Sequence, residues 1–331
     1  MKTLRKLLWP LSPLYAGVIW LRNVFYDWGW FASVQPNTPV LCVGNLSVGG
    51  SGKTPMVELI LRYYTKRHRQ VAVLSRGYGR TSKGLQQVQP NSKALDVGDE
   101  PLQIKRKFPA TQVVVDANRL RGIHWLEAEI QPELIILDDG FQHRKVAASH
   151  NLLLTTWDKL YPNEGYLPSG DLRDHRNQAR RADLIIVTKC PATLTTAQRE
   201  EVVSTINPLP IQQVLFATLR YDEPRDSLGN PISWDKLRKT SLTLVTGVAN
   251  PEPLTNYLNE RGVDYIHHCF SDHYNFSDTD IAILKREGPI ITTEKDAVRL
   301  MNWMSDFFVL GIRHHFEPED KIVLENYLSR I

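Results

Sequence analysis

The sequence has few cysteines, little excess charge and no repeat or low-complexity segment. Its three cysteines, Cys42, Cys190 and Cys269, lie far apart in a chain of 331 residues. This odd and scattered set fits neither a disulfide framework nor a metal site, so we expect a reducing compartment. A net charge of +4 argues against a dedicated nucleic-acid-binding protein. The composition is that of an ordinary globular chain, and its length favours two domains.

A long apolar run is also missing, although the N-terminal segment comes close to one. Residues 7–21 carry no charge, but the run is shorter than the ~20 residues that span a bilayer. Pro10 and Pro13 interrupt it, and no small-residue cleavage site of a signal peptide follows. Tryptophans and early cations predict a helix that lies in the membrane interface. The alternative is a terminal helix packed on the protein's own core. The residues concerned are Lys2, Arg5, Lys6, Trp9, Trp20, Trp28 and Trp30.

A glycine-rich stretch is the motif around which the rest of the chain is organised. It follows a predicted buried strand at residues 39–43 and precedes a predicted amphipathic helix at 56–66. Strand, glycine turn and helix form the context of a phosphate-binding loop, in which Lys53 would reach the β- and γ-phosphates and the Thr54 hydroxyl would hold Mg²⁺. The alternative is a turn that only connects strand to helix. The predicted nucleotide-binding residues here are Ser47, Val48, Gly49, Gly50, Ser51, Gly52, Lys53 and Thr54.

Apolar strands alternate with helical segments along most of the chain, which predicts a P-loop NTPase-like, doubly wound parallel sheet. A turn-rich stretch at 221–231 marks a boundary, after which the alternation restarts. We therefore expect an N-terminal membrane-interface segment at 1–34, a P-loop kinase domain at 35–225 and a smaller α/β domain at 226–331. The predicted strands are 71–74, 112–115, 134–137, 152–154, 184–187, 242–246, 265–268 and 289–292. The predicted later helices are 253–261 and 277–286.

Two carboxylates follow the predicted strand 134–137, where a phosphate-loop fold places the acidic partner of Mg²⁺. Asp138 is preferred for this role, with Asp139 beside it; the alternative is a pair of acids that cap a turn. Thr188 and Lys189 end a later strand, where some nucleotide-binding proteins recognise the base. A guanine-reading box would need Asn at 188 and Asp at 191, and the sequence has Thr and Pro there. ATP is therefore expected rather than GTP.

Seven stretches, two of which contain residues described above, carry a resemblance to a known family. They are 43–55 (VGNLSVGGSGKTP), 75–80 (SRGYGR), 98–101 (GDEP), 138–144 (DDGFQHR), 167–173 (LPSGDLR), 270–273 (FSDH) and 294–296 (EKD). With these motifs the chain resembles the tetraacyldisaccharide 4′-kinases, the lipid A 4′-kinases of Gram-negative bacteria, over nearly its full length. That family also lacks the first glycine of the usual phosphate loop, where this chain has Ser47.

The resemblance implies phosphorylation, with ATP and Mg²⁺, of the 4′-hydroxyl of a tetraacylated glucosamine disaccharide 1-phosphate at the cytoplasmic face of the inner membrane. It implies that Asp99 is the catalytic base and His273 its partner, and that Arg173 lies near the phosphates. Asp174 stands where the family usually has Glu beside the metal, and its side chain is one methylene shorter. His273 belongs to the second unit, so closure of the two units would complete the site.

Other polar residues are candidates for binding sugar or phosphate, with a solvated surface as the alternative. They are Arg76, Arg80, Asn118, Arg119, Gln142, His143 and Arg144. The partners expected are a lipid A precursor and the membrane surface, with no nucleic acid and no obligate protein partner. Two other functions stay open at this point: a regulatory or metal-delivering NTPase, and a soluble kinase of a small metabolite.

Overall fold

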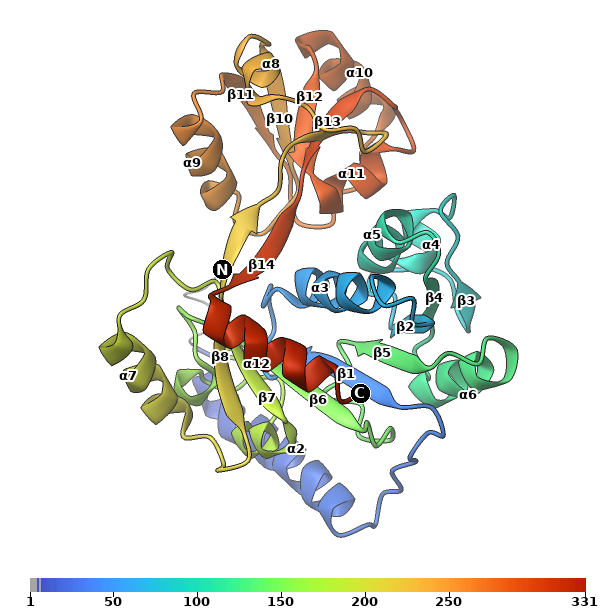
Figure 1. Ribbon diagram of the computed structural model, residues 1–331, viewed down its shortest axis with the longest axis vertical. Coiled ribbons are helices and arrows are strands. Elements are labelled where there is room, and N and C mark those ends of the chain that lie inside the picture. The colour runs from blue at the N-terminus through green and yellow to red at the C-terminus, as the bar shows by residue number, and fades with distance from the viewer. Residues whose placement is uncertain (1–4, 6) are drawn as a thin grey trace.

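The computed structural model describes residue 5 and residues 7–331, which form two α/β units joined by a pair of strands (Figure 1). The larger unit contains a nine-stranded sheet and the smaller unit a five-stranded sheet. This confirms the predicted fold class, a parallel sheet wound with helices, with a second, smaller α/β unit. The expected cations Lys2 and Lys6 lie outside the described residues.

The larger sheet is parallel except at its two edges, where β14 and β3 run antiparallel to their neighbours. In spatial order its strands are β14 (Ile312–Phe316), β8 (Gln213–Tyr221), β7 (Leu184–Thr188), β6 (His150–Thr156), β1 (Val40–Asn45), β5 (Leu134–Asp138), β2 (Val71–Ser75), β4 (Gln112–Val115) and β3 (Gln86–Gln87).

Alternate side chains of the central strand β1 enter two separate cores, one on each face of the sheet. Leu41 and Val43 pack in the core beneath α3, α5 and α12, whereas Val40 and Cys42 pack in the core beneath α6 and α7. Burial on both faces explains why the strand reads as a continuous apolar run. The helices of this unit are η1 (Trp9–Leu11), α2 (Ser12–Asp27), α3 (Lys53–Thr65), α4 (Ala94–Val97), α5 (Asp99–Lys107), α6 (Arg119–Glu129), η2 (Tyr161–Asn163), η3 (Arg176–Arg181), α7 (Thr196–Ile206) and α12 (Pro318–Leu328).

The smaller unit is built on a second, mainly parallel sheet with its own apolar cores. Its strands, in spatial order, are β11 (Tyr265–Cys269), β10 (Leu242–Thr246), β12 (Ile290–Thr293), β13 (Phe307–Leu310) and the antiparallel β9 (Arg225–Asp226). Its helices are α8 (Trp234–Arg238), α9 (Glu252–Glu260), α10 (Asp278–Glu287) and α11 (Glu294–Leu300).

The end of the chain differs from the expected boundary, because the smaller unit does not extend over all of 226–331. After β13 the chain returns to the larger unit, where β14 pairs with the outer edge of β8. Helix α12 then buries Leu324 and Leu328 in the core beneath α3. The smaller unit is thus an insertion between β8 and β14, and the two crossings of the chain run side by side (Figure 1).

Helix α2 docks on the larger unit through polar contacts and leaves apolar side chains exposed. Its Asn23 amide donates to Asp174 Oδ1 at 2.8 Å, and its Tyr15 hydroxyl donates to the Arg173 carbonyl at 3.2 Å. Among the described residues no helix is long and apolar enough to cross a membrane. The exposed apolar side chains around α2 are Leu7, Leu8, Trp9, Leu11, Leu14, Val18, Trp20, Leu21, Trp28, Trp30 and Phe31.

Candidate active site

The glycine-rich loop joins the buried strand β1 to helix α3, which begins at Lys53. Gly52 ends the loop in the left-handed region, with φ of +83°, and an added Cβ would lie 2.8 Å from the ring of His314. Both the backbone and the space therefore require glycine there. The first N–H groups of α3 have no partner within the helix, so this end of the helix is a natural anion site.

The charged head of Lys53 lies in a small network at the mouth of this loop. Its Nζ is 3.6 Å from Asp139 Oδ1 and 3.4 Å from Asn45 Oδ1. Arg173 donates to Asp139 Oδ2 at 3.0 Å and to Asn45 Oδ1 at 2.5 Å. Two predicted cations thus converge on one carboxylate, and a bound polyphosphate would share the same charges.

The two adjacent carboxylates have opposite electrostatic environments. Asp138 is buried, and Ser75 donates to its Oδ2 at 2.9 Å. Burial, together with the charges of Glu100 and Asp139, raises the pKa of Asp138 to about 7. Burial also opposes ionisation of Asp139, but Lys53 and Arg173 lower the pKa of Asp139 to about 2. Asp138 therefore holds a proton to a much higher pH than Asp139 does.

Thr188 contacts the phosphate loop from within the sheet, and its side chain does not face open space. It is fully buried, and its hydroxyl donates to the Ser51 carbonyl at 2.9 Å. Lys189, the next residue, has a positive φ of 56°, and its Nζ lies 4.0 Å from where a Cβ on Gly50 would be. Thr188 thus holds the loop backbone, whereas Lys189 brings a charged group close to it.

Asp99 and His273 are in contact, although they belong to different units. His273 Nδ1 lies 2.7 Å from Asp99 Oδ2, and Lys295 Nζ lies 3.2 Å from His273 Nε2. Because the ammonium of Lys295 can only donate, Nε2 of His273 accepts. Nδ1 therefore carries the ring proton and donates a hydrogen bond to Asp99. Arg299 binds both oxygens of Asp99 at 2.8 Å. Burial alone would raise the pKa of Asp99, but the bonds from His273 and Arg299 hold it below its usual value.

This dyad lies near the phosphate loop, at the carboxyl edge of the larger sheet. Asp99 begins α5, and its neighbour Glu100 is close enough for its charge to raise the pKa of Asp138. A Cβ on Gly98 would lie 3.1 Å from Gly77, in the loop that follows β2. The base that the resemblance implies and the expected metal carboxylate therefore lie near each other.

Comparison with known proteins decides the family. The sequence profile of the family described as Tetraacyldisaccharide-1-P 4′-kinase matches residues 4–329. The chain belongs to this family. It is 40% identical to the tetraacyldisaccharide 4′-kinase of Flavobacterium johnsoniae, over 96% of this chain and 94% of that protein. It is 39% identical to the enzyme of the same name from Bacteroides thetaiotaomicron, over 90% and 84%.

A solved structure shares the fold. It is LpxK from Aquifex aeolicus in complex with ATP, which superposes with a TM-score of 0.80 at 29% identity and covers 98% of both chains. The predicted function, an ATP-using kinase of lipid A biosynthesis, is the one that the family and its named members indicate.

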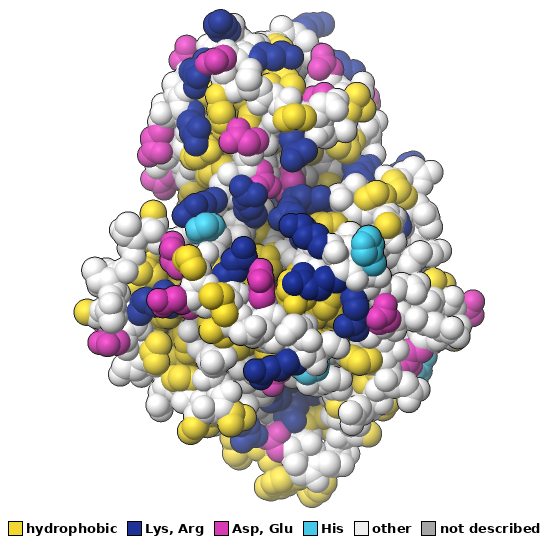
Figure 2. All heavy atoms as spheres, viewed as in Figure 1, with side chains coloured by type: hydrophobic (Ala, Val, Ile, Leu, Met, Phe, Trp, Pro, Cys, Tyr) yellow, Lys and Arg dark blue, Asp and Glu magenta, His cyan; other side chains and the backbone are white. Residues whose placement is uncertain are grey.

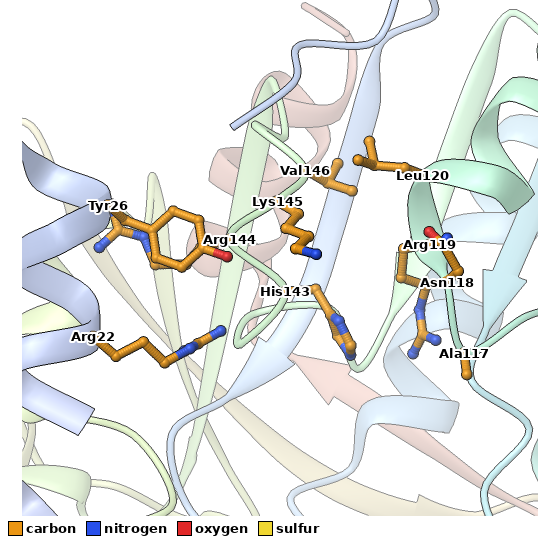
Figure 3. Close-up of a pocket in the computed structure, with 10 residues that line it drawn as sticks. All are labelled: Arg22, Tyr26, Ala117, Asn118, Arg119, Leu120, His143, Arg144, Lys145 and Val146. Carbon is orange, nitrogen blue, oxygen red and sulfur yellow. The ribbon is translucent and has the colours of Figure 1, made fainter. Parts of the chain in front are cut away.

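A cationic pocket of about 380 Å³ lies between α2 and the start of α6 in this kinase. Figure 3 shows Arg22 and Arg119 on either side of His143, with Arg144 and Lys145 along the same loop. Arg119 is 3% exposed, and its Nε and Nη2 have no hydrogen-bond partner among the described residues. Burial lowers the pKa of Arg119 to about 10 and that of His143 to about 4. The pocket thus presents buried donors without an acceptor.

The predicted sugar- or phosphate-binding residues are partly gathered in this pocket. Asn118, Arg119, His143 and Arg144 line it, whereas Gln142 instead donates to the Asn45 carbonyl at 2.8 Å. Figure 2 shows lysine and arginine side chains gathered across the middle of one face, beneath the smaller unit. An acceptor with negative charge would find cations both here and at the phosphate loop.

The expected metal ligands differ in how well they fit Mg²⁺. Asp138 and Asp174 each have one buried oxygen without a partner among the described residues, Oδ1 of Asp138 and Oδ2 of Asp174. Asp138 also ends β5 beside β1, the strand that leads into the phosphate loop, so it is the carboxylate best placed to bind a cation there. Asp139 is engaged by Lys53 and Arg173. Asp174 uses its Oδ1 for Asn23 and for the His175 backbone N–H. No group of three or more His, Cys, Asp or Glu in the described part of the chain could hold a metal by itself. A magnesium site of one carboxylate, the Thr54 hydroxyl and nucleotide phosphates needs no such group.

Three residues of the site had no clear signal in the sequence. Arg299 clamps Asp99, Arg22 reaches the pocket from α2, and His314 contacts the phosphate loop from β14. Each is separated from its partner by a long stretch of chain and stands in no motif of recognisable spacing. Asn45 lies within the family motif at 43–55, but its bonds to Lys53 and Arg173 depend on the turn that follows β1.

Proposed function

We propose that this protein transfers the γ-phosphoryl group of ATP, with Mg²⁺, to the 4′-hydroxyl of a tetraacylated glucosamine disaccharide 1-phosphate. The observation that carries the proposal is the shared edge of the larger sheet. There the phosphate loop and Asp138 lie near the Asp99–His273 pair, since the charge of Glu100, the residue after Asp99, acts on Asp138. A loop for the donor and a base for the acceptor are the two parts that a kinase needs.

In this proposal the chain acts mainly by positioning and by neutralising charge. The loop N–H groups and Lys53 hold the phosphates, and Arg173 adds a second cation beside Lys53. Thr54 and Asp138 would hold Mg²⁺, which neutralises phosphate charge when it is bound. Asp138 gives up its proton for this role, because its pKa lies near 7 without a metal.

Asp99 accepts the proton of the 4′-hydroxyl, and His273 and Arg299 orient its carboxylate. Its lowered pKa makes it a weak base. A loose phosphoryl-transfer transition state tolerates this, because it needs a well-placed acceptor more than a strong one. Since His273 and Arg299 belong to the smaller unit, the position of that unit sets the orientation of the base.

The acceptor would lie against the cationic pocket, with its acyl chains toward the exposed apolar side chains of α2. A contiguous exposed apolar surface marks an interaction site for lipid or protein. Tryptophans such as Trp9, Trp28 and Trp30 suit the depth of lipid headgroups. We infer peripheral attachment through this helix at the cytoplasmic face of the inner membrane, and binding of the acceptor's 1-phosphate by Arg119 and its neighbours.

The function is tested by incubating the protein with Mg²⁺, γ-labelled ATP and the detergent-solubilised disaccharide 1-phosphate. Label in the glycolipid is the expected result. Label released only as inorganic phosphate would instead favour a regulatory NTPase.

The pocket is tested with Arg119→Met and, as a control on the same helix, Arg121→Met, whose guanidinium is exposed and paired with Asp116. Arg119→Met should raise KM for the 1-phosphorylated acceptor at least about tenfold, since a charge-assisted bond contributes about 1.5–3 kcal/mol. It should leave KM unchanged for an acceptor without the 1-phosphate. Equal effects on both acceptors would place the 1-phosphate elsewhere.

A further inference from the structure

His314 is a buried histidine that no step of the proposed reaction uses. It lies on β14 and is 4% exposed. Its Nε2 lies 2.8 Å from the Gly52 carbonyl oxygen, and since a carbonyl can only accept, Nε2 carries the proton. Its Nδ1 has no hydrogen-bond partner in the described part of the chain. Burial lowers the pKa of His314 to about 4, so the ring is neutral at pH 7.

The Gly52 carbonyl belongs to the peptide group that joins Gly52 to Lys53, the first residue of α3. It also accepts the first hydrogen bond of the helix, from the Met56 N–H at 3.1 Å. A peptide group is planar, and its C=O and N–H point in opposite directions. A bond that fixes the Gly52 carbonyl therefore also fixes the Lys53 N–H. This N–H belongs to the end of α3 that faces the phosphate site.

The neighbouring peptide group is held in a similar way. Thr188 on β7 donates to the Ser51 carbonyl at 2.9 Å, just as His314 on β14 donates to that of Gly52. Two successive carbonyls of the loop are thus fixed by buried donors on the sheet. The ring of His314 also occupies the space where a Cβ on Gly52 would lie, so it packs directly against the left-handed turn.

We propose that His314 is a positioning residue for ATP, which holds the Gly52–Lys53 peptide with its N–H directed at the phosphates. A loop without this bond can rotate the peptide, and the bound nucleotide must then restore its orientation. Part of the binding free energy is lost in doing so. The proposal rests on the proposed function, because it needs ATP at this loop.

The decisive comparison is between variants that keep the donor and variants that remove it. In His314→Gln the side-chain amide reaches about as far as Nε2, whereas in His314→Asn it reaches only about as far as Nδ1. We expect His314→Asn and His314→Leu to raise KM for ATP about fivefold to tenfold, the equivalent of one neutral hydrogen bond. His314→Gln should stay within about twofold of the unaltered protein. KM for the lipid acceptor should not change in any of them.

His315→Leu is the matched control, since His315 is the next residue on β14 and its side chain is 37% exposed. Circular dichroism and the melting temperature without nucleotide identify folded variants. If His314→Leu does not fold, the Gln and Asn variants alone decide the matter. Equal ATP affinities for these two, or a loss that falls on acceptor KM, would overturn the proposal. Failure of the proposed function would look different, because the unaltered protein would then not phosphorylate the lipid.

Discussion

Replacing Asp138 by Asn should stabilise the metal-free protein while abolishing its activity. Folding raises the pKa of this carboxyl from 3.8 to about 7. Between these two pH values the folded protein still binds a proton that the unfolded chain has lost. Stability therefore falls as the pH rises from about 4 to 7. At about 1.4 kcal/mol for each pH unit, the penalty at pH 8 amounts to at most about 4 kcal/mol. Asn carries no charge and avoids it.

The assay is thermal or urea unfolding in EDTA at pH 5 and pH 8, with Asp139→Asn as the adjacent control. Ionisation of Asp139 has the opposite effect on stability, because Lys53 and Arg173 lower its pKa to about 2. Its ionised form stabilises the fold above pH 4, by less than about 2 kcal/mol, since a third of its side chain is exposed and solvent screens it.

We thus expect Asp138→Asn to unfold later than the unaltered protein at pH 8, with a smaller advantage at pH 5, and Asp139→Asn to unfold earlier. Adding Mg²⁺ and ATP should reduce the difference in stability between Asp138→Asn and the unaltered protein, because the ligands stabilise the unaltered protein more. An Asp138→Asn protein that is less stable at pH 8 in EDTA would refute the reasoning.

Four further predictions follow from the site and from α2. Lys53→Ala should lower kcat at least about 10²-fold without loss of fold, because its head group contacts only polar partners; near-normal turnover would reject the loop assignment. Arg299→Gln removes a cation that lowers the pKa of Asp99, so the acid limb of the kcat/KM profile should move to higher pH, and an unmoved limb would argue against Asp99 as base. Asp99→Ala and His273→Ala should each lower kcat by roughly 10²- to 10⁴-fold, and the double variant should lose little more; multiplicative losses would show independent roles. Deleting residues 1–31 should weaken binding to anionic vesicles in a flotation assay, and unchanged flotation would place the membrane contact elsewhere.

The sequence predicted the parts of the fold whose signals are local. Buried parallel strands read as apolar runs, and the phosphate loop is a contiguous motif. Strands β8 and β14 were not predicted, because polar residues such as Arg220 and Arg313 alternate with their apolar ones. For the same reason the return of the chain to the larger unit was missed.

In the candidate site, too, the residues with local sequence signals were predicted, and those brought together only by tertiary contacts had no such signal. Lys53 and Asp138 follow from local patterns of strand and turn. The contact between Asp99 and His273 spans 174 positions, and only resemblance to a family suggested it. The clamp of Arg299 on Asp99 depends on how the two units meet, which no spacing in the sequence encodes.

The insertion of the smaller unit between β8 and β14 has a consequence for biosynthesis. A ribosome delivers the chain from its N-terminus, and domains generally fold as they emerge. The strands β1 to β8 would appear first, but the outer edge of β8 has no partner until residues 312–316 arrive. Leu324 and Leu328 complete the core beneath the phosphate-loop helix later still. The nucleotide site, encoded near the start of the chain, thus acquires its last supports at the end of translation, after the whole smaller unit has been made.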